Sequence, residues 1–326
     1  APVGIDLGTT FSAIGFLENG KLTIIHNNAG NEITPSVVHY GPGTIMVGEE
    51  AVRKLATDKS STVYGIKRFM GRPHDDAHIK KRDWPFQVVR GREGRASVRI
   101  AGDTYSPEEV SGAILKYLKE IAAKFMNGVP REAVITVPAK FTNVQRTATK
   151  DAGELAGFKV LQVINEPTAA ALAFCRAFPA AKKRKILVYD LGGGTFDVSI
   201  VETDGKHTTV LSTDGLPNLG GIDFDYRIYE EAVARFMEEG VEVSKWGWPL
   251  MQACETAKKA LTEKSTARID YRAKNGKQVG FDFTYDTFID ICDDLFEQTF
   301  IQIDKVLKEA NISKKDLDDI VLVGGS

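Results

Sequence analysis

The hydrophobic and polar positions of this chain form the same pattern twice. Residues 4–21 read GIDLGTTFSAIGFLENGK, and residues 188–206 read VYDLGGGTFDVSIVETDGK. In each segment an apolar strand ends in Asp-Leu-Gly, a Gly/Thr turn follows, and an alternating strand leads to an Asn-Gly or Asp-Gly hairpin signal. A third strand is predicted after each hairpin, over 21–25 and 208–212. The sequence therefore predicts two halves that open with the same three-strand meander.

Helices are predicted between these strands. Ser106 precedes Pro107, the pattern of a capped helix start, and the apolar face of this helix is predicted to be Val110, Ile114, Leu118, Ile121 and Phe125. Further helices are predicted over 143–156, 223–239, 249–262 and 287–310, and further strands over 133–137, 268–271, 279–285 and 320–323. Strands that alternate with helices in two copies indicate an α/β protein of two lobes.

Composition and charge narrow the class of protein. With 43% hydrophobic and 26% charged residues and a net charge of −2, the chain lacks the basic excess of a nucleic-acid-binding domain. No apolar stretch approaches the ~18 residues of a membrane span. Cys175, Cys254 and Cys292 are far apart, which predicts reduced thiols without a disulfide or zinc site. The basic run 182–185 is interpreted as a solvated connector.

The two repeated turns carry the candidate chemistry. Glycine lets a phosphate approach successive backbone N–H groups, and threonine adds hydroxyl donors. The turn residues are Gly8, Thr9 and Thr10 in the first copy, and Gly192, Gly193, Gly194 and Thr195 in the second. Asp6 and Asp190 end the preceding strands, where carboxylates can hold the water shell of a magnesium ion. One such turn alone would be read as a plain β-turn, but two copies predict a clamp for a polyphosphate.

These paired turns resemble those of the actin, hexokinase and heat-shock ATPase superfamily. Further segments make the chain similar to the seventy-kilodalton heat-shock chaperone family: KRFMGR, VITVPAKFTNVQRTATKDAGELAGF, VINEPTAAALAF, LGGIDFDYR and IVLVGGS. The resemblance spans essentially all 326 residues. HIKKRDWPFQVV looks more like eukaryotic than bacterial members. The resemblance implies an actin/hexokinase-like α/β fold, in which two lobes with ribonuclease H-like cores enclose a nucleotide cleft.

The resemblance also implies a division of the chain. Lobe I would comprise residues 1–180, with a core of 1–35 and 106–180 and an outer subdomain of 36–105. Lobe II would comprise residues 181–326, with a core of 181–218 and 291–326 and an outer subdomain of 219–290. The family's last adenine-binding segment, its linker and its peptide-binding domain are expected beyond Ser326.

Catalytic roles follow from the resemblance alone. Lys67 would reach the γ-phosphate and the attacking water, where a cation stabilises developing charge. Without the resemblance, Lys67 and Arg68 would be read as an exposed basic pair. The implied catalytic residues are Lys67, Asp190, Thr195, Asp6 and Glu166. Of these, Asp6, Asp190 and Glu166 would hold Mg²⁺ through water, while Thr195 and Asp197 would coordinate K⁺ or water.

Nucleotide contacts are implied in the same way for ATP or ADP. Gly220 and Gly221 would pass near the ribose, and the adenosine would meet one helix face that could otherwise be solvated. The remaining implied contacts are Phe11, Glu255, Lys258, Lys259, Thr262, Gly324, Gly325 and Ser326. The chain departs from the family pattern at Ile222, where glutamate is usual, and at Lys259, where many eukaryotic members have arginine. Lysine lacks the planar guanidinium face, so weaker adenine stacking is expected.

Three further residues have implied roles, and two of them have a second reading. Pro138 and Arg146 resemble a switch proline and an interlobe arginine, although Pro138 alone is a simple strand terminator. Cys254, beside Glu255, could block the adenosine pocket when modified, or be a buried structural thiol.

The predicted function is the ATPase domain of a heat-shock chaperone. The alternatives are a nucleotide sensor without turnover and a small-molecule kinase of the same superfamily. The implied partners are J-domain co-chaperones, nucleotide exchange factors and, through the absent C-terminal domain, client polypeptides. No nucleic-acid or membrane partner is expected. A cytoplasmic location is predicted, with the endoplasmic reticulum lumen or another organelle as alternatives.

Overall fold

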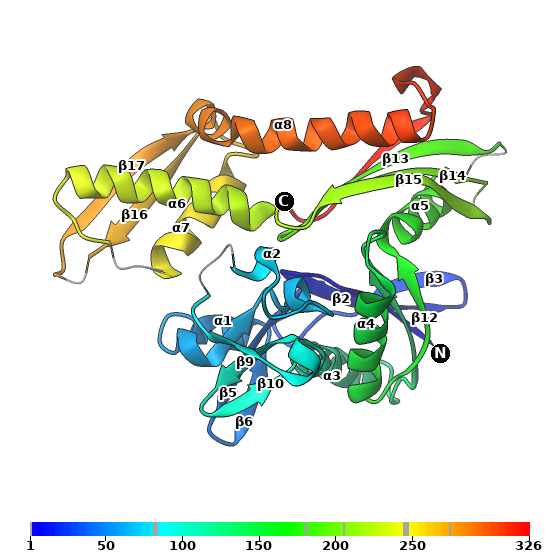
Figure 1. The fold of residues 1–326 in the computed structure, drawn as a ribbon, viewed down its shortest axis with the longest axis horizontal. Helices are drawn as coiled ribbons and strands as arrows, with labels where there is room; N and C mark the ends of the chain where they lie inside the picture. Colours follow the sequence, from blue (N-terminus) through cyan, green and yellow to red (C-terminus); the bar gives the residue numbers. More distant parts are fainter. Residues whose placement is uncertain (1, 81–83, 180–181, 205, 244–247, 274) are drawn as a thin grey trace.

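The computed structural model describes residues 2–80, 84–179, 182–204, 206–243, 248–273 and 275–326. The predicted lobe boundary at 180/181, residues 81–83 of the HIKKRDWPFQVV segment and Gly205 of the second hairpin signal lie outside these ranges. The described chain is a mixed α/β protein (Figure 1). None of its described helices has the length and apolarity needed to cross a membrane.

The first main sheet contains the N-terminal meander. Its strand order is β12 (Lys159–Asn165), β11 (Glu132–Val137), β1 (Val3–Leu7), β2 (Phe11–Glu18) and β3 (Lys21–Ile24), and β4 (Thr34–Pro35) pairs with β2. Strand β1 runs antiparallel to β2 and parallel to β11. Its alternating side chains Val3, Ile5 and Leu7 are buried with residues of α3 (Pro107–Phe125) and α4 (Asn143–Leu155).

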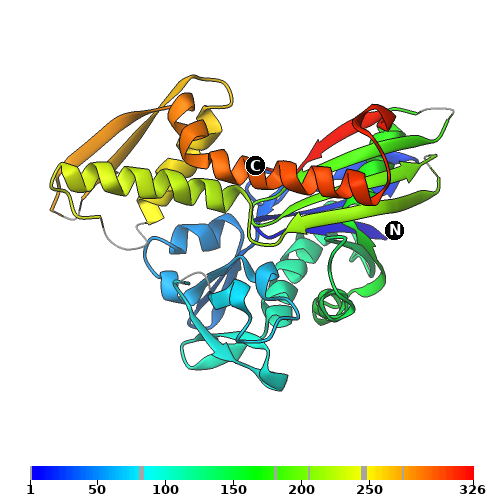
Figure 2. The same cartoon turned by 45° about the horizontal axis from the view of Figure 1, so that its top comes forward.

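The second main sheet repeats this arrangement. Its order is β15 (Thr208–Leu216), β14 (Phe196–Thr203), β13 (Arg184–Leu191) and β18 (Asp319–Val323). Helices α5 (Glu166–Ala177) and α8 (Tyr285–Glu309) cover opposite faces of this sheet (Figure 2). Neighbouring residues of β13 show this, because Val188 packs with Ala171 of α5 and Leu187 packs with Val306 of α8.

Smaller elements extend from both sheets. Before α3 lie α1 (Glu49–Lys54), α2 (Ala77–Lys80) and two three-stranded sheets, formed by β5 (Val37–Gly41), β6 (Thr44–Val47) and β7 (Thr62–Tyr64), and by β8 (Gln87–Arg90), β9 (Ala96–Ile100) and β10 (Asp103–Tyr105). Between β15 and α8 lie α6 (Gly221–Glu238), α7 (Trp248–Ala260) and the hairpin of β16 (Thr266–Arg272) and β17 (Gln278–Thr284). Short 3₁₀ helices are Lys59–Ser61, Ile66–Phe69, Arg92–Gly94 and Lys314–Asp316.

The local signals predicted the main elements well. Both meanders are present, and α3 begins at Pro107 with the Ser106 hydroxyl accepting from the backbone of Glu109 at 3.1 Å. Phe125 is 51% exposed but touches the buried ring of Phe16 edge-on, on the predicted apolar face of α3. One detail was wrong. Helix α7 ends at Ala260, so Thr262 lies in the following turn, where its N–H donates to Lys259 at 3.2 Å.

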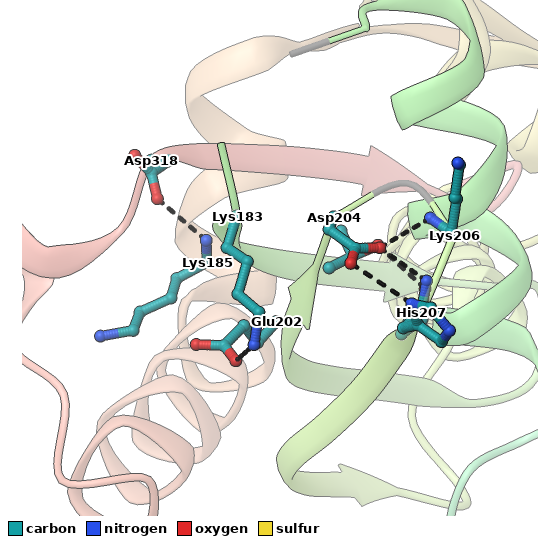
Figure 3. A network of polar contacts seen from close by, with 9 residues as sticks. Lys183, Lys185, Glu202, Asp204, Lys206, His207 and Asp318 are labelled. Carbon is teal, nitrogen blue, oxygen red and sulfur yellow. Dashed lines mark hydrogen bonds and ion pairs between the residues drawn. The ribbon is translucent and has the colours of Figure 1, made fainter. Parts of the chain in front are cut away.

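Only the first half of the basic run is the predicted solvated connector, because Lys182 and Lys183 are exposed before β13, whereas Arg184 and Lys185 are the first residues of that strand and are partly buried. The run makes ion pairs at one end of the second sheet. Lys183 lies 3.1 Å from Glu202, and the backbone N–H of Lys185 donates to Asp318 at 2.9 Å (Figure 3). In the next hairpin, Asp204 accepts from the backbone N–H of His207 at 2.7 Å. These hydrogen bonds lower the pKa of Asp204 to about 2.

Candidate functional site

The two repeated turns lie against each other. A Cβ atom built on Gly193 would be 1.8 Å from Thr10 Oγ1, and one on Gly194 would be 2.4 Å from Thr9 Cγ2. Any side chain at these glycines would push the turns apart. The Thr10 hydroxyl is buried and has no hydrogen-bond partner among the described residues. It is therefore an unused hydrogen-bond donor at the contact between the two turns.

The carboxylates of the two meanders share one electrostatic environment. Burial raises the pKa of Asp190 to about 8, and the negative charges of Glu166, Asp197 and Asp6 add to this effect. Burial and Glu166 raise the pKa of Asp197 to about 7, against the hydrogen bond from Thr195. Asp6 itself is exposed and accepts from Thr136 Oγ1 at 2.9 Å. The site therefore holds more negative charge than the protein neutralises.

Lys67 supplies the main positive charge. Its Nζ lies 2.6 Å from Glu166 Oε1, and the two side chains are only 10% and 14% exposed. Burial alone would lower the pKa of Lys67, but Glu166, Asp6 and Asp190 outweigh it and raise that pKa. A 3₁₀ turn holds Lys67, while Glu166 begins α5 directly after β12. The alternative reading of an exposed basic pair is wrong for both Lys67 and Arg68, which are buried.

Arg68 is a residue of the site that sequence reasoning missed. Its Nη2 donates to Gly194 O at 2.5 Å and lies 3.3 Å from Asp223 Oδ2. That carboxylate also accepts from the backbone N–H of Gly220 at 2.9 Å. Arg68 thus ties the second turn to the start of α6. The sequence signal was its position beside Lys67, but a basic pair does not reveal which of its members is buried.

The glycines assigned to the ribose adjoin the second turn. The N–H of Gly221 donates to Gly192 O at 3.0 Å, and Ser326 Oγ donates to the same oxygen at 3.1 Å. A Cβ on Gly324 would lie 2.2 Å from Leu191 O, whereas one on Gly325 would meet open space. The chain's last residues therefore lie beside Gly192, and Figure 1 shows the C-terminus next to the start of α6.

The residues assigned to adenosine are already engaged within the protein. Lys258 Nζ lies 2.8 Å from Asp225 Oδ1 and donates to Gly221 O at 3.1 Å. Lys259 Nζ lies 2.6 Å from Glu255 Oε1 and 5.9 Å from the centre of the Phe11 ring. The Lys258 side chain is only 15% exposed, whereas those of Glu255 and Lys259 are 32% and 58% exposed, so this face of the helix is partly solvated.

An apolar cavity of about 120 Å³ adjoins this region. Thr9, Thr10 and Glu255 contribute to its wall, and its larger side chains include Leu55, Tyr64, Ile222, Tyr226, Trp248 and Met251. The rings of Tyr64 and Trp248 lie 6.3 Å apart. The departure at Ile222 therefore contributes to an apolar wall rather than a charged one.

The acidic residues fit a hard cation held largely through water. Among the described residues, no three His, Cys, Asp or Glu side chains converge as direct metal ligands. The oxygen chemistry of Asp6, Glu166 and Asp190 is that which Mg²⁺ prefers, and Mg²⁺ commonly keeps several waters. The raised pKa of Asp190 shows that a positive charge beside it would stabilise its ionised form.

The remaining predicted residues are placed as follows. Pro138 follows the end of β11, and Arg146 Nη2 donates to Asn165 Oδ1 at 2.6 Å.

Cys254 is fully buried, and burial raises the pKa of its thiol to about 12. Thiolate is the reactive form of cysteine, so this environment favours the structural reading of Cys254.

Comparison with known proteins decides the family. The family model described as Hsp70 protein matches residues 2–326. The chain belongs to the Hsp70 family. It is 40% identical over 336 residues to the stromal 70 kDa heat shock-related protein, chloroplastic, of Pisum sativum, an alignment that covers 99% of this chain and 47% of that Hsp70 relative. The chain therefore spans about half the length of this relative.

Membership makes the chain an Hsp70 chaperone homologue that corresponds to the ATPase-domain region. Hsp70 members are heat-shock-related chaperones that bind ATP and act as ATPases with co-chaperone partners.

Proposed function

We propose that this chain binds Mg-ATP at its two repeated turns and hydrolyses it to ADP and phosphate. The observation that carries the proposal is the contact between the Thr9–Thr10 turn and the Gly193–Gly194 turn, beside the buried Lys67–Glu166 pair. Glycines that leave no room for a Cβ, an unpartnered Thr10 hydroxyl and a buried lysine are features that suit a polyphosphate.

The proposed reaction is in-line attack of water on the γ-phosphorus. A bond forms between the water oxygen and phosphorus, the bond to the bridging oxygen of ADP breaks, and the proton leaves with phosphate or solvent.

Lys67 would neutralise charge on the transferring group, while Thr10 and the turn amides would orient it. Bound Mg²⁺ would supply further charge neutralisation through Asp6, Glu166 and Asp190. Thr195 and Asp197 would hold water or K⁺. Positioning carries such reactions, so no strong general base is required.

The architecture proposed for this activity is the actin-like one. Residues 1–180 would form lobe I and residues 181–326 lobe II, with the outer subdomains at 36–105 and 219–290. The repeated sheets and their separate apolar clusters support this division. Closure of the lobes on nucleotide would control peptide binding by a C-terminal domain, and Pro138 and Arg146 would report the nucleotide state.

The nucleotide base and the partners belong to the same proposal. Gly220, Gly221, Glu255, Lys258, Lys259 and Gly324–Ser326 would surround the adenosine, with Phe11 nearby. The proposed partners are J-domain co-chaperones and nucleotide exchange factors. The cytoplasmic location stays a prediction, and the name of the relative from Pisum sativum places that protein in the chloroplast stroma.

ATP binding and hydrolysis by the purified chain test the proposal, with Lys67→Ala as the key variant. We expect hydrolysis in the unaltered chain, its loss in Lys67→Ala, and no change in Lys150→Ala, whose side chain lies 3.6 Å from Glu154 in an exposed pair on α4. ATP binding without turnover would support a nucleotide sensor instead. Phosphate transfer to sugars would support a small-molecule kinase.

A further inference from the structure

The loop of residues 138–141 leaves the first main sheet at the end of β11. It connects β11 to α4, and Arg146 of α4 holds its backbone. Arg146 Nε donates to Phe141 O at 3.0 Å, and Nη2 donates to Ala139 O at 3.0 Å. These two carbonyls flank Lys140. The backbone on both sides of Lys140 is therefore fixed by a charged donor.

Lys140 crosses from this loop to the second sheet. Its Nζ forms an ion pair and hydrogen bond with Asp214 Oδ1 of β15. Asp214 is only 14% exposed, and its Oδ1 also accepts from the N–H of Gly215 at 2.7 Å. Lys305 of α8 lies 3.9 Å from the other oxygen. Burial works against the charged form, but the hydrogen bonds from Lys140 and Gly215 hold the pKa of Asp214 below its usual value.

Asp214 precedes the residue of β15 that pairs with Asp197 of β14. Gly215 is the cross-strand partner of Asp197 in the β14–β15 ladder. A Cβ on Gly215 would lie 2.5 Å from Phe196 O and 2.9 Å from Asp197 Oδ1. The β15 backbone thus presses against Asp197, and a shift of Asp214 would be transmitted to that carboxylate.

The other end of the loop reaches Lys67. The Lys67 ammonium lies 5.8 Å from the centre of the Phe141 ring, within the range of a cation–π contact. Two adjacent residues of this loop therefore reach both parts of the candidate site. Phe141 contacts Lys67, and Lys140 contacts Asp214 of β15, the strand that pairs with the strand of Asp197.

We propose that the Lys140–Asp214 ion pair is a clamp that joins the two main sheets and positions Asp197 relative to Lys67. Lys140 and Asp214 are positioning residues, because neither belongs to the two phosphate turns. The clamp is a property of the fold, and only its effect on ATP turnover rests on the proposed function.

Three variants test the clamp: Lys140→Ala, Asp214→Ala, and the charge exchange that combines Lys140→Asp with Asp214→Lys. Hydrogen exchange on the nucleotide-free chain is the first measurement. Each alanine variant is expected to lower protection by about two- to fivefold in both 138–141 and 213–216, the size expected for a partly exposed pair. The charge exchange should restore part of this protection.

The matched control is Lys159→Ala. Lys159 lies 3.1 Å from Glu132 in an exposed pair that joins two strands of one sheet. It should leave exchange in 138–141 and 213–216 unchanged. If the two alanine variants also leave both segments unchanged, the clamp is overturned, whether or not the chain binds ATP.

The second measurement separates positioning from simple support of the fold. With ATP, the alanine variants should lower kcat by about two- to fivefold at an unchanged melting temperature, with partial rescue by the charge exchange. An unchanged kcat beside altered hydrogen exchange would overturn the positioning role. A chain that shows the exchange effects but does not turn over ATP would keep the clamp and reject the proposed function.

Discussion

Lys67 and Glu166 are 99 residues apart in the chain, and their charged atoms lie 2.6 Å apart in a buried ion pair. The pair joins a 3₁₀ turn to the first residue of α5, and it lies close enough to Asp6 and Asp190 for all four charges to interact. Buried charges are tolerated only when they are compensated. The pair therefore makes both stability and reactivity depend on pH and on bound cations.

Replacement of Lys67 should make stability fall more steeply with pH. Glu166 has a raised pKa because of burial and the nearby Asp6, and Lys67 opposes this shift. In Lys67→Ala the pKa of Glu166 should rise further, so the variant keeps most of its stability below the ordinary glutamate pKa and loses it as pH rises. Breaking a buried pair costs about 3–5 kcal/mol.

Thermal unfolding at pH 5 and pH 8 measures this effect of Lys67→Ala. Lys150→Ala, in an exposed helix pair, should show no pH-dependent loss. An equal loss for Lys67→Ala at both pH values would contradict the assigned charge state of Glu166.

Asp190 should destabilise the nucleotide-free chain at alkaline pH. Its pKa is about 8 in the folded chain against 3.8 as the ordinary value, because of burial and three neighbouring carboxylates. Between these values the folded state binds more protons, so the free energy of unfolding falls as pH rises from about 4 to about 8. Asp190→Asn should therefore raise stability at pH 8 by about 1–3 kcal/mol and have little effect at pH 4.

Denaturant titrations with and without Mg²⁺ check the Asp190 prediction. Added Mg²⁺ should stabilise the unaltered chain at pH 8 more than it stabilises Asp190→Asn, because only the former gains a charged carboxylate there. Equal Mg²⁺ effects on both would argue against this carboxylate as part of a metal site.

Gly193→Ala should separate the two turns. The new Cβ would lie 1.8 Å from Thr10 Oγ1, far inside contact distance, so a cost of about 1–3 kcal/mol and a loss of ATP affinity are expected. Gly128→Ala is the control, because its Cβ would meet no atom closer than 4.0 Å. ATP affinity retained in Gly193→Ala would show that the nucleotide does not require this contact.

Lys259→Arg should tighten nucleotide binding. A guanidinium plane stacks on an aromatic base better than an ammonium does, which predicts an increase of about two- to fivefold in affinity. The pair with Glu255 would be retained by arginine. Titration with a fluorescent ATP analogue measures the effect, and unchanged affinity would place the base away from Lys259.

The elements that were predicted depend on short-range signals. Both meanders follow from alternating side chains bounded by Gly, Asn and Asp, and α3 follows from the Ser106 cap. The two small sheets within 37–105 were not predicted, since their strands are three to five residues long and give little periodicity. Thr262 was misplaced because a helix ends within a residue or two of any pattern-based boundary.

The candidate site was only partly visible in the chain. The turn glycines and threonines could be recognised because a phosphate-binding turn needs them next to one another in sequence. Arg68 could not, since its partners Gly194 and Asp223 are far along the chain and only burial distinguishes it from an ordinary surface arginine. The same holds for Lys140, whose partner Asp214 belongs to the other main sheet.

By itself, the sequence determined the duplicated strand–turn–strand units, the residues of their turns and the likeness to the Hsp70 family. These depend on neighbouring residues, whose backbone preferences and side-chain alternation act locally. Only the tertiary structure decided that the turns touch, that Lys67 is paired with Glu166 in a buried environment, and that Lys140 reaches Asp214. Those relationships arise when two sheets pack together, and packing fixes burial and charge separation that no local pattern specifies.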